Sequence, residues 1–233
     1  MKLCGVRIDD LTMGEAVERA LSSEGPCFVV TPNAVMLDAC RRNADYTALL
    51  NRSNLSLADG AGVMLCAKRA GTPLCERIAG ISFGEALLER AASEGLRVFL
   101  LGGGENVAYD AAERLAKKYE GLQICGSFWG YFEKSGEEDL RVTQLIRAAR
   151  PDVLFVCFGF PLQEEWIASH LHLLEDVRVM AGLGGALDVW SGRIKRAPTF
   201  VSGCGMEWAW RMVREPKRLR NLLAILRCVF WRT

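Results

Sequence analysis

Short apolar runs alternate with amphipathic stretches along most of this 233-residue chain. Several of the runs are rich in Val, Ile and Phe, which is typical of strands that are buried on both faces of a sheet. The alternation predicts an α/β fold with a Rossmann-like, mainly parallel sheet flanked by helices. We expect strands at Leu3–Ile8, Cys27–Thr31, Leu55–Ala58, Val98–Leu101, Gln123–Ser127, Val153–Phe158 and Val177–Ala181.

Three short motifs predict where helices begin. Each places a hydroxyl side chain three residues before a glutamate, which is the capping-box pattern of a helix N-terminus. The pairs are Thr12 with Glu15, Ser82 with Glu85, and Ser135 with Glu138.

Charge is distributed unevenly along the chain. Residues 193–233 contain ten basic and two acidic side chains, a net charge of +8. The whole chain has 29 basic and 28 acidic residues, so residues 1–192 carry a net charge of −7. Trp208, Trp210 and Trp231 lie in the same basic segment. Cations interleaved with tryptophan suit a lipid headgroup layer, and they also suit nucleic acid.

We therefore divide the chain into an α/β core, residues 1–195, and a basic, amphipathic C-terminal appendage, residues 196–233. Pro216 separates two expected helices near Ser202–Arg214 and Pro216–Trp231. One alternative is an ordinary helix that packs on the core with a solvated basic back. The run from Arg211 to Arg220 contains a single acid, however, whereas a solvated face usually mixes both signs.

Composition excludes several classes of protein. No stretch of about 18 uninterrupted apolar residues is present, so we expect no membrane span. We also expect no signal peptide at the N-terminus. The nine cysteines are scattered without a Cys-x-x-Cys pair, which favours reduced, mostly buried thiols in a cytosolic protein. His170 and His172 have no partner ligands in view, so we expect no metal site.

Candidate ligand-binding residues follow the expected strands. Ligands of parallel sheets bind beyond the carboxyl ends of the strands. The residues at those ends are glycines, amides, a hydroxyl and one acid. Such residues bind a nucleotide or a sugar more readily than a metal cluster. The candidates are Thr31, Asn33, Asp59, Gly102, Gly103, Gly104 and Gln163.

Most of these residues also have a purely structural interpretation. Asp59 could act as a general base or cap a helix, and the cap is the commoner role of such an aspartate. Thr31 and Asn33 could bind a ligand, but Thr-Pro-Asn is also a common turn and cap sequence. The amide of Gln163 could read a base or a sugar hydroxyl, or it could simply be solvated in the first turn of a helix.

The glycine turn at Gly102–Gly104 leaves the same choice open. Glycines before a helix let the backbone approach a phosphate, but they also make ordinary tight turns. The Gly-x-Gly-x-x-Gly pattern is incomplete because Val107 holds the third place, and the Walker lysine is missing. A nicotinamide-dependent oxidoreductase is therefore a weaker alternative function. A nucleic-acid-binding module that uses the basic appendage is another, although it lacks a recognisable reader motif.

Nine motifs occur together in order along the chain. Together they resemble the WecG/TagA/CpsF glycosyltransferases over nearly the whole sequence. They are Thr31-Pro32-Asn33, Ala58-Asp59-Gly60-x-Gly62, Arg77-x-x-Gly80, Gly102-Gly103, Gly130-Tyr131-Phe132, Gly159-x-Pro161-x-Gln163-Glu164-x-Trp166, Gly182-x-Gly184-Gly185-Ala186-x-Asp188, Lys195-Arg196-Ala197-Pro198 and Gly205-Met206-Glu207-Trp208.

The resemblance implies an inverting hexosyltransferase of wall teichoic acid-like surface polysaccharide synthesis. It would move N-acetylmannosamine, or a related sugar, from a UDP-sugar to N-acetylglucosamine on a polyprenyl diphosphate. It implies no cofactor and no metal, no nucleic-acid partner, and an appendage that meets an anionic membrane surface. The protein would then be cytoplasmic and peripheral on the inner face of the membrane, and it could form a homo-oligomer.

By motif position, the resemblance makes Asp59 the catalytic base. It makes Thr31, Asn33 and Gln163 pocket residues. The sequence departs from the family pattern at Ser82, Trp129 and Leu162. These departures affect the expected donor sugar and the details of the pocket more than the expected class of reaction. The remaining residues that we expect to bind substrate are Arg77, Gly102, Gly103, Gly104, Arg196, Arg211, Arg214 and Arg218.

Overall fold

The computed structural model describes residues 1–195 and Arg227. The expected appendage helices, apart from Arg227, lie outside the described residues. Arg196, Arg211, Arg214 and Arg218 lie outside them too, so the roles expected of these arginines stay predictions.

Strands and helices alternate through the described chain, as the apolar pattern predicts. The strands are β1 (Lys2–Leu3), β2 (Val6–Arg7), β3 (Cys27–Val30), β4 (Leu55–Ser56), β5 (Arg97–Gly102), β6 (Gln123–Phe128), β7 (Val153–Cys157) and β8 (Val179–Gly182). The helices are α1 (Met13–Leu21), α2 (Ala34–Arg42), α3 (Ala44–Asn51), α4 (Ala61–Arg69), α5 (Gly80–Glu94), α6 (Val107–Lys118), α7 (Gly136–Ala149), α8 (Leu162–His170) and α9 (Ala186–Trp190).

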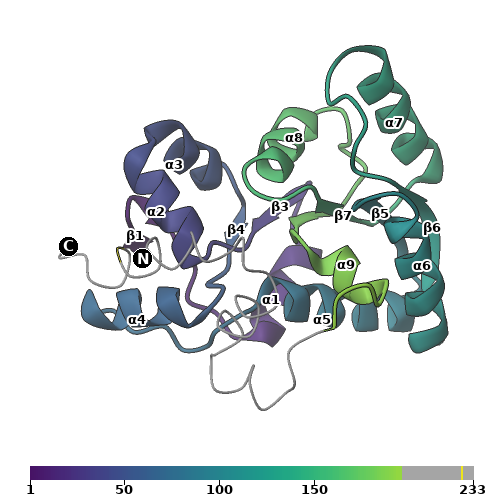
Figure 1. The fold of residues 1–233 in the computed structure, drawn as a ribbon. Coiled ribbons are helices and arrows are strands. Elements are labelled where there is room, and N and C mark those ends of the chain that lie inside the picture. Colours follow the sequence, from purple (N-terminus) through teal and green to yellow (C-terminus); the bar gives the residue numbers. More distant parts are fainter. Residues whose placement is uncertain (196–226, 228–233) are drawn as a thin grey trace.

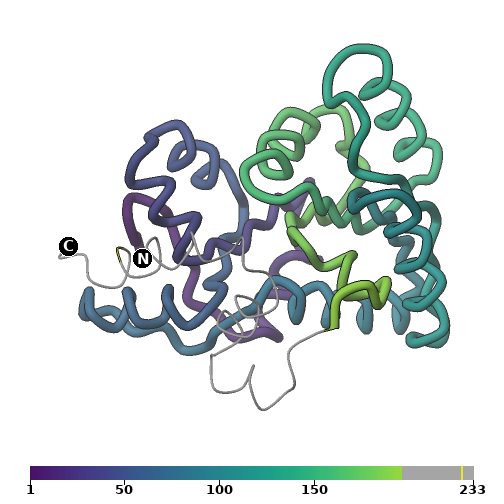
Figure 2. Tube along the Cα trace, in the orientation of Figure 1, coloured from purple at the N-terminus to yellow at the C-terminus, as the bar shows by residue number. Residues whose placement is uncertain are grey.

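Six strands form one parallel sheet in the order β4-β3-β8-β7-β5-β6. This confirms the predicted Rossmann-like architecture. The pairing of β3 with β8 joins an early and a late segment of the chain in the middle of the sheet (Figures 1 and 2). The carboxyl ends of all six strands consequently share one edge.

The predicted single strand at Leu3–Ile8 is wrong. This segment folds into a small antiparallel pair, β1 with β2, outside the main sheet. Cys4 and Gly5 between the two strands have φ angles of 49° and 79°, and this left-handed backbone reverses the chain.

Side chains of alternate strand residues fill two apolar layers, one on each face of the sheet. In β3, Cys27 and Val29 belong to the layer covered by α1, α5, α6 and α9. Phe28 and Val30 belong to the opposite layer, which contains side chains of α2, α3, α4, α7 and α8. Figure 1 shows α1, α5 and α9 below the sheet and α2, α3, α7 and α8 above it. Burial on both faces explains why the strands appear in the sequence as continuous apolar runs.

One of the three predicted capping boxes is confirmed. Thr12 N donates to Glu15 Oε2 at 2.8 Å, and Thr12 Oγ1 accepts from Glu15 N. The box at Ser82 is wrong because α5 begins earlier, at Gly80, and places Ser82 inside the helix. Ser135 does occupy the N-cap of α7, but its side chain makes no capping hydrogen bond.

Among the described residues, three free cysteines are buried: Cys27, Cys40 and Cys157. Burial raises the thiol pKa to about 11 for Cys27 and Cys40 and to about 12 for Cys157. Cys75 is exposed, so the expected burial of cysteines does not extend to it. Among the described helices, none combines the length and apolar character needed to cross a bilayer.

Candidate functional site

A chain of contacts runs along the carboxyl edge of the sheet and brings several predicted residues together. At the β4 end, Asp59 N donates to Pro32 O at 3.0 Å, next to the end of β3. At the β3 end, buried Thr31 directs Oγ1 to Gly182 O of β8 at 3.5 Å. A β-carbon on Gly182 would in turn lie 2.8 Å from Gln163 Nε2. Thr31, Asp59 and Gln163 thus follow β3, β4 and β7, and Gly182 of β8, which lies between β3 and β7, links Thr31 to Gln163.

The Arg77-x-x-Gly80 motif packs against the same edge. Ile78 N donates to Ala58 O at 3.0 Å, which places half-buried Arg77 beside the segment that carries Asp59. A β-carbon on Gly80 would lie 2.8 Å from Thr31 Oγ1. Glycine is therefore required there for the close approach of α5 to β3.

Asp59 is half-buried and lies one residue before the N-cap position of α4. That position is Gly60, with φ 89° and no side-chain capping hydrogen bond. Asp59 is therefore not the N-cap residue, and a carboxylate at the end of a buried strand stays a candidate for proton transfer.

Asn33, by contrast, has the structural role that its sequence context suggests. Its Oδ1 accepts hydrogen bonds from Val35 N at 3.0 Å and Met36 N at 3.1 Å. These bonds satisfy two of the free backbone donors at the N-terminus of α2. The cap interpretation of Asn33 is confirmed, and a contact with ligand stays a prediction.

The Gln163 side chain is almost completely buried, with 4% of its surface exposed, so its interpretation as a solvated residue is wrong. Its Oε1 accepts from Gly159 N at 3.1 Å and from Gly184 N at 2.9 Å. One amide group thereby ties the turn after β7 to the turn after β8. Its Nε2 donates to Glu164 Oε1 at 2.8 Å.

The glycine turn after β5 is packed closely against its neighbours. Gly102 has φ 138°, and a β-carbon there would lie 2.4 Å from Cys157 O of β7. Gly103 N donates to Cys157 O at 3.2 Å, while Gly103 O accepts from Gly130 N at 2.8 Å. Gly103 itself has φ 69°, and a β-carbon there would lie 2.6 Å from Val107 Cγ1, so glycine is required at both positions. The hydrogen bond to Cys157 O also occupies the Gly103 N–H. A phosphate contact of this turn is therefore best sought at Gly104 and the N-terminus of α6.

The last described residues of the predicted core lie beside this turn. Arg193 Nη2 donates to Glu105 O at 2.8 Å and forms an ion pair of 3.1 Å with Asp110 of α6. Arg193 therefore lies next to the glycine turn, a few residues before the predicted appendage.

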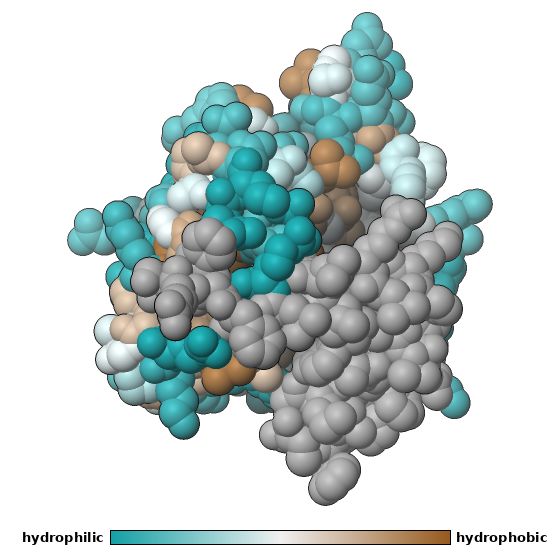
Figure 3. Space-filling model, turned by 60° about the vertical axis from the view of Figure 1, so that its left-hand side comes forward, coloured by the Kyte–Doolittle hydropathy of each residue, from teal (hydrophilic) through white to brown (hydrophobic). Residues whose placement is uncertain are grey.

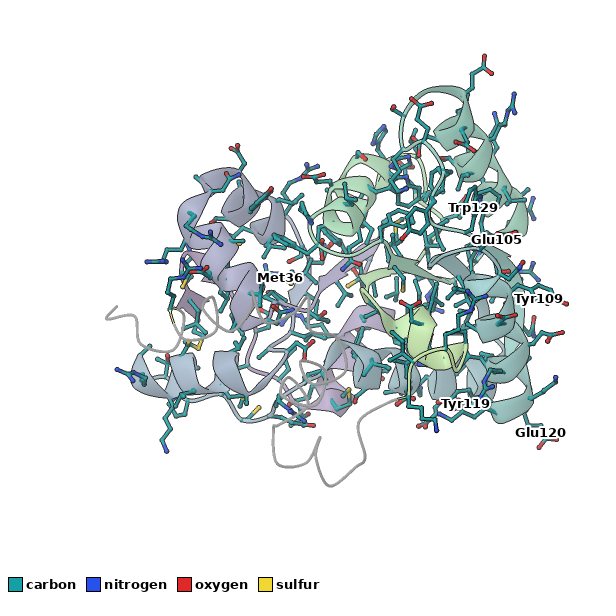
Figure 4. All side chains as sticks on the ribbon, in the orientation of Figure 1. Met36, Glu105, Tyr109, Tyr119, Glu120 and Trp129 are labelled. Atoms are coloured by element: carbon teal, nitrogen blue, oxygen red, sulfur yellow. The ribbon has the colours of Figure 1, made fainter. Side chains whose placement is uncertain are left out.

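An aromatic loop after β6 lies against the glycine turn. The sequence indicated its Gly130-Tyr131-Phe132 motif and Trp129 but did not predict its exposed pair of rings. Trp129 is 40% exposed, Tyr131 is 76% exposed, and their ring centroids are 6.5 Å apart. Trp129 and Glu105 both lie at the end of the sheet formed by β5 and β6 (Figure 4). The Gly130-Tyr131-Phe132 motif was the one available signal for this loop.

Lys134 fixes the aromatic loop in place. Its Nζ donates to Gly130 O at 2.5 Å and to Phe132 O at 2.9 Å, and lies 4.3 to 4.4 Å from the ring centroids of Phe132 and Phe158. Burial lowers the pKa of Lys134. No motif in the sequence indicates this role.

His170 is buried in a structural network. Its ring stacks on Trp166 at 3.9 Å, and both side chains contact the carboxylate of Asp139, with His170 Nε2 3.0 Å from one oxygen and Trp166 Nε1 2.7 Å from the other. These contacts join α8 to α7. Within residues 1–195, no group of three or more His, Cys, Asp or Glu side chains could hold a metal ion.

Arg227 gives the one described contact of the appendage. Its Nη2 lies 3.4 Å from Asp38 Oδ2 of α2. The Asp38 side chain is fully buried and also pairs with Arg41 and Arg42 of its own helix. Residue 227 thus lies against the same helix that Asn33 caps.

Comparison with known proteins matches the entire chain. A model of the glycosyl transferase WecG/TagA/CpsF family matches residues 1–233. A Bacillus spizizenii protein named N-acetylglucosaminyldiphosphoundecaprenol N-acetyl-beta-D-mannosaminyltransferase is 37% identical over 198 residues, covering 85% of this chain and 75% of that protein. Proteins of the same name from Staphylococcus aureus strains MW2 and NCTC 8325 are 34% identical over 228 residues, covering 96% of this chain and 88% of each protein.

Proposed function

Since the chain belongs to the WecG/TagA/CpsF family of glycosyl transferases, we propose that it transfers N-acetylmannosamine, or a related sugar, from a UDP-sugar. The acceptor is N-acetylglucosamine carried on a polyprenyl diphosphate, the substrate class in the names of its relatives. The observation that carries the proposal is the carboxyl edge of the sheet. There, Thr31, Asp59 and Gln163 follow β3, β4 and β7 of one parallel sheet, and the glycine turn follows β5.

Asp59 is the proposed general base. The acceptor hydroxyl attacks the anomeric carbon of the donor from the side opposite UDP, and its proton passes to the Asp59 carboxylate as the new C–O bond forms. The bond to UDP breaks in the same step, and UDP leaves with the electron pair. A single displacement inverts the configuration at the anomeric carbon.

Negative charge then accumulates on the departing UDP. Backbone N–H groups at Gly104 and the start of α6, together with the Arg77 guanidinium, are the proposed stabilising groups in the described core. Arg196, Arg211, Arg214 and Arg218 would add cations from the appendage. Trp129 and Tyr131 offer exposed rings near the glycine turn, where a uracil base could stack.

The acceptor lipid places the reaction at a membrane surface. On the face drawn in Figure 3, the coloured residues are mostly hydrophilic, and their hydrophobic patches are small and separate. We propose that the appendage, rather than this face of the core, supplies the attachment. Each of its Lys and Arg residues near anionic headgroups would contribute about 1 kcal/mol.

The decisive test is a donor screen. The full chain would be mixed with a synthetic prenyl-diphosphate-linked N-acetylglucosamine and a panel of UDP-sugars, with product detected by mass spectrometry. We expect transfer from UDP-N-acetylmannosamine. Turnover of none of the UDP-sugars would refute the proposal, and so would calorimetric binding of NADH in preference to UDP.

Vesicle flotation tests the attachment separately. We expect the full chain to float with vesicles that contain anionic lipid and to be released at high salt, because exposed charges are screened. Equal recovery with neutral vesicles would contradict the electrostatic attachment without touching the reaction.

A further inference from the structure

Glu164 is a buried acid that the proposed reaction does not use. Its exposed fraction is 0%, and its Oε2 atom has no hydrogen-bond partner. Its Oε1 accepts the hydrogen bond from Gln163 Nε2 at 2.8 Å. Burial without a partner for one oxygen is costly for a carboxyl group, so this placement calls for an explanation.

We propose that Glu164 is a positioning residue that orients the Gln163 amide for the sugar transfer proposed above. The role rests on that proposed function. Three contacts determine the orientation of the amide: Gly159 N and Gly184 N donate to its oxygen, and Glu164 accepts from its nitrogen.

The surroundings of the carboxyl group favour its protonated form below about pH 7. Burial, with a smaller contribution from the nearby Glu165 carboxylate, raises the pKa of Glu164 to about 7, although hydrogen bonds from Gln163 and from the Glu164 backbone oppose the shift. The buried Cys40 thiol of α2 interacts with Glu164 and stays protonated, because burial raises its pKa to about 11. Among the described residues, no cation contributes to the ionisation of Glu164.

The orientation leaves one donor for a ligand. Gln163 Nε2 carries two hydrogens, and Glu164 takes one of them. The second has no acceptor among the described residues. A β-carbon on Gly182 would lie 2.8 Å from Nε2, and the Thr31 hydroxyl donates to Gly182 O, so this amide lies at the edge of the sheet where the sugar is proposed to bind.

Two variants separate positioning from packing. In Glu164→Gln, an amide oxygen still accepts from Gln163 Nε2, whereas in Glu164→Met a side chain of similar volume offers no acceptor. Glu165→Gln is the matched control because Glu165 is the exposed neighbour on the same helix. Each protein would be assayed for kcat, donor KM and unfolding midpoint.

We expect Glu164→Gln and Glu165→Gln to keep kcat within about twofold of wild type, and Glu164→Met to lower kcat about tenfold, the loss expected for one positioning hydrogen bond. The unfolding midpoint of Glu164→Met should stay close to that of wild type, because removing the desolvation cost of the acid and leaving the Gln163 N–H without its acceptor have opposite effects. Wild-type kcat in Glu164→Met would overturn the proposal. So would equal impairment of a folded Glu164→Gln.

A second measurement distinguishes failure of this proposal from failure of the proposed function. The side-chain amide resonances of Gln163 would be assigned by NMR with the Gln163→Leu variant, without any substrate. We expect slow hydrogen exchange of this amide in wild type and Glu164→Gln, and fast exchange in Glu164→Met. Identical exchange in all three proteins would overturn the positioning role even if sugar transfer is found, whereas the expected pattern would uphold the orientation even if transfer is not found.

Discussion

Replacing Glu164 by glutamine should change how the stability of the protein depends on pH. The carboxyl group is fully buried, and its pKa is raised to about 7 from an ordinary value of 4.5. Because the folded pKa lies above the unfolded one, the folded protein retains a proton that the unfolded chain has lost. The resulting stabilisation is fully present below about pH 4.5 and is lost as the pH rises through 7.

The size of the effect follows from the two pKa values. A difference of one pKa unit corresponds to 1.36 kcal/mol, so raising the pKa from 4.5 to about 7 corresponds to about 3 kcal/mol of unfolding free energy lost between acid and neutral pH. Glutamine cannot ionise and keeps the acceptor for Gln163. We therefore expect the stability of Glu164→Gln, relative to wild type, to increase by about 2–3 kcal/mol between pH 5 and pH 8.

Urea unfolding followed by tryptophan fluorescence measures this difference, since Trp166 and Trp190 are both buried. Subtracting the wild-type free energy from that of the variant at each pH cancels the other titrating groups, as long as they act independently. Glu165→Gln, tested in the same way, should give a difference that changes little with pH. Parallel pH curves for wild type and Glu164→Gln would refute a neutral, buried Glu164.

Three further results are expected. Asp59→Asn should lower turnover by at least about 100-fold at an unchanged unfolding midpoint, since general-base catalysis contributes about that much; wild-type turnover would remove Asp59 as the base. Gly182→Ala should destabilise the fold by about 1–3 kcal/mol and lower kcat, because its new methyl group would lie 2.8 Å from Gln163 Nε2. Gly185→Ala is its control, with the nearest atom an ordinary 3.6 Å away, and equal effects of the two would contradict the argument. EDTA should leave transfer intact, and a loss restored by Mg²⁺ would show that the reaction needs a metal.

The main sheet could be predicted because its strands are buried on both faces, which imprints an apolar run on each one. The order of the strands could not be predicted. It depends on pairings between distant segments, such as β3 with β8, which are about 150 residues apart and leave no local pattern in the sequence. Local signals also competed with tertiary contacts. Ser82 and Glu85 match the capping-box pattern, which predicts a helix that begins after Ser82. In the structure α5 already begins at Gly80, where the helix packs closely against Thr31.

The candidate site was partly predictable for a geometric reason. Residues that follow parallel strands converge on one edge, so Thr31, Asp59 and Gln163 could be selected from the order of the elements alone. The burial of Gln163 could not, because an amide in the first turn of a helix is usually solvated. Lys134 was missed for a similar reason: its partners are two carbonyl groups and two aromatic rings that only the fold brings together.

Glu164 shows how two effects at one helix end can be ranked. An acid in the first turn of α8 is ordinarily stabilised as an anion by the helix dipole, an effect of about 0.3–1 kcal/mol at exposed positions. That preference suits exposed Glu165, but burial dominates at Glu164 and raises its pKa to about 7. Below that pH the protonated carboxyl group can hold the Gln163 amide without adding a negative charge to the edge where the donor diphosphate is proposed to bind. An acid with an ordinary pKa would hold the same amide but be ionised and repel that diphosphate, so the burial of Glu164 suits the role proposed for it.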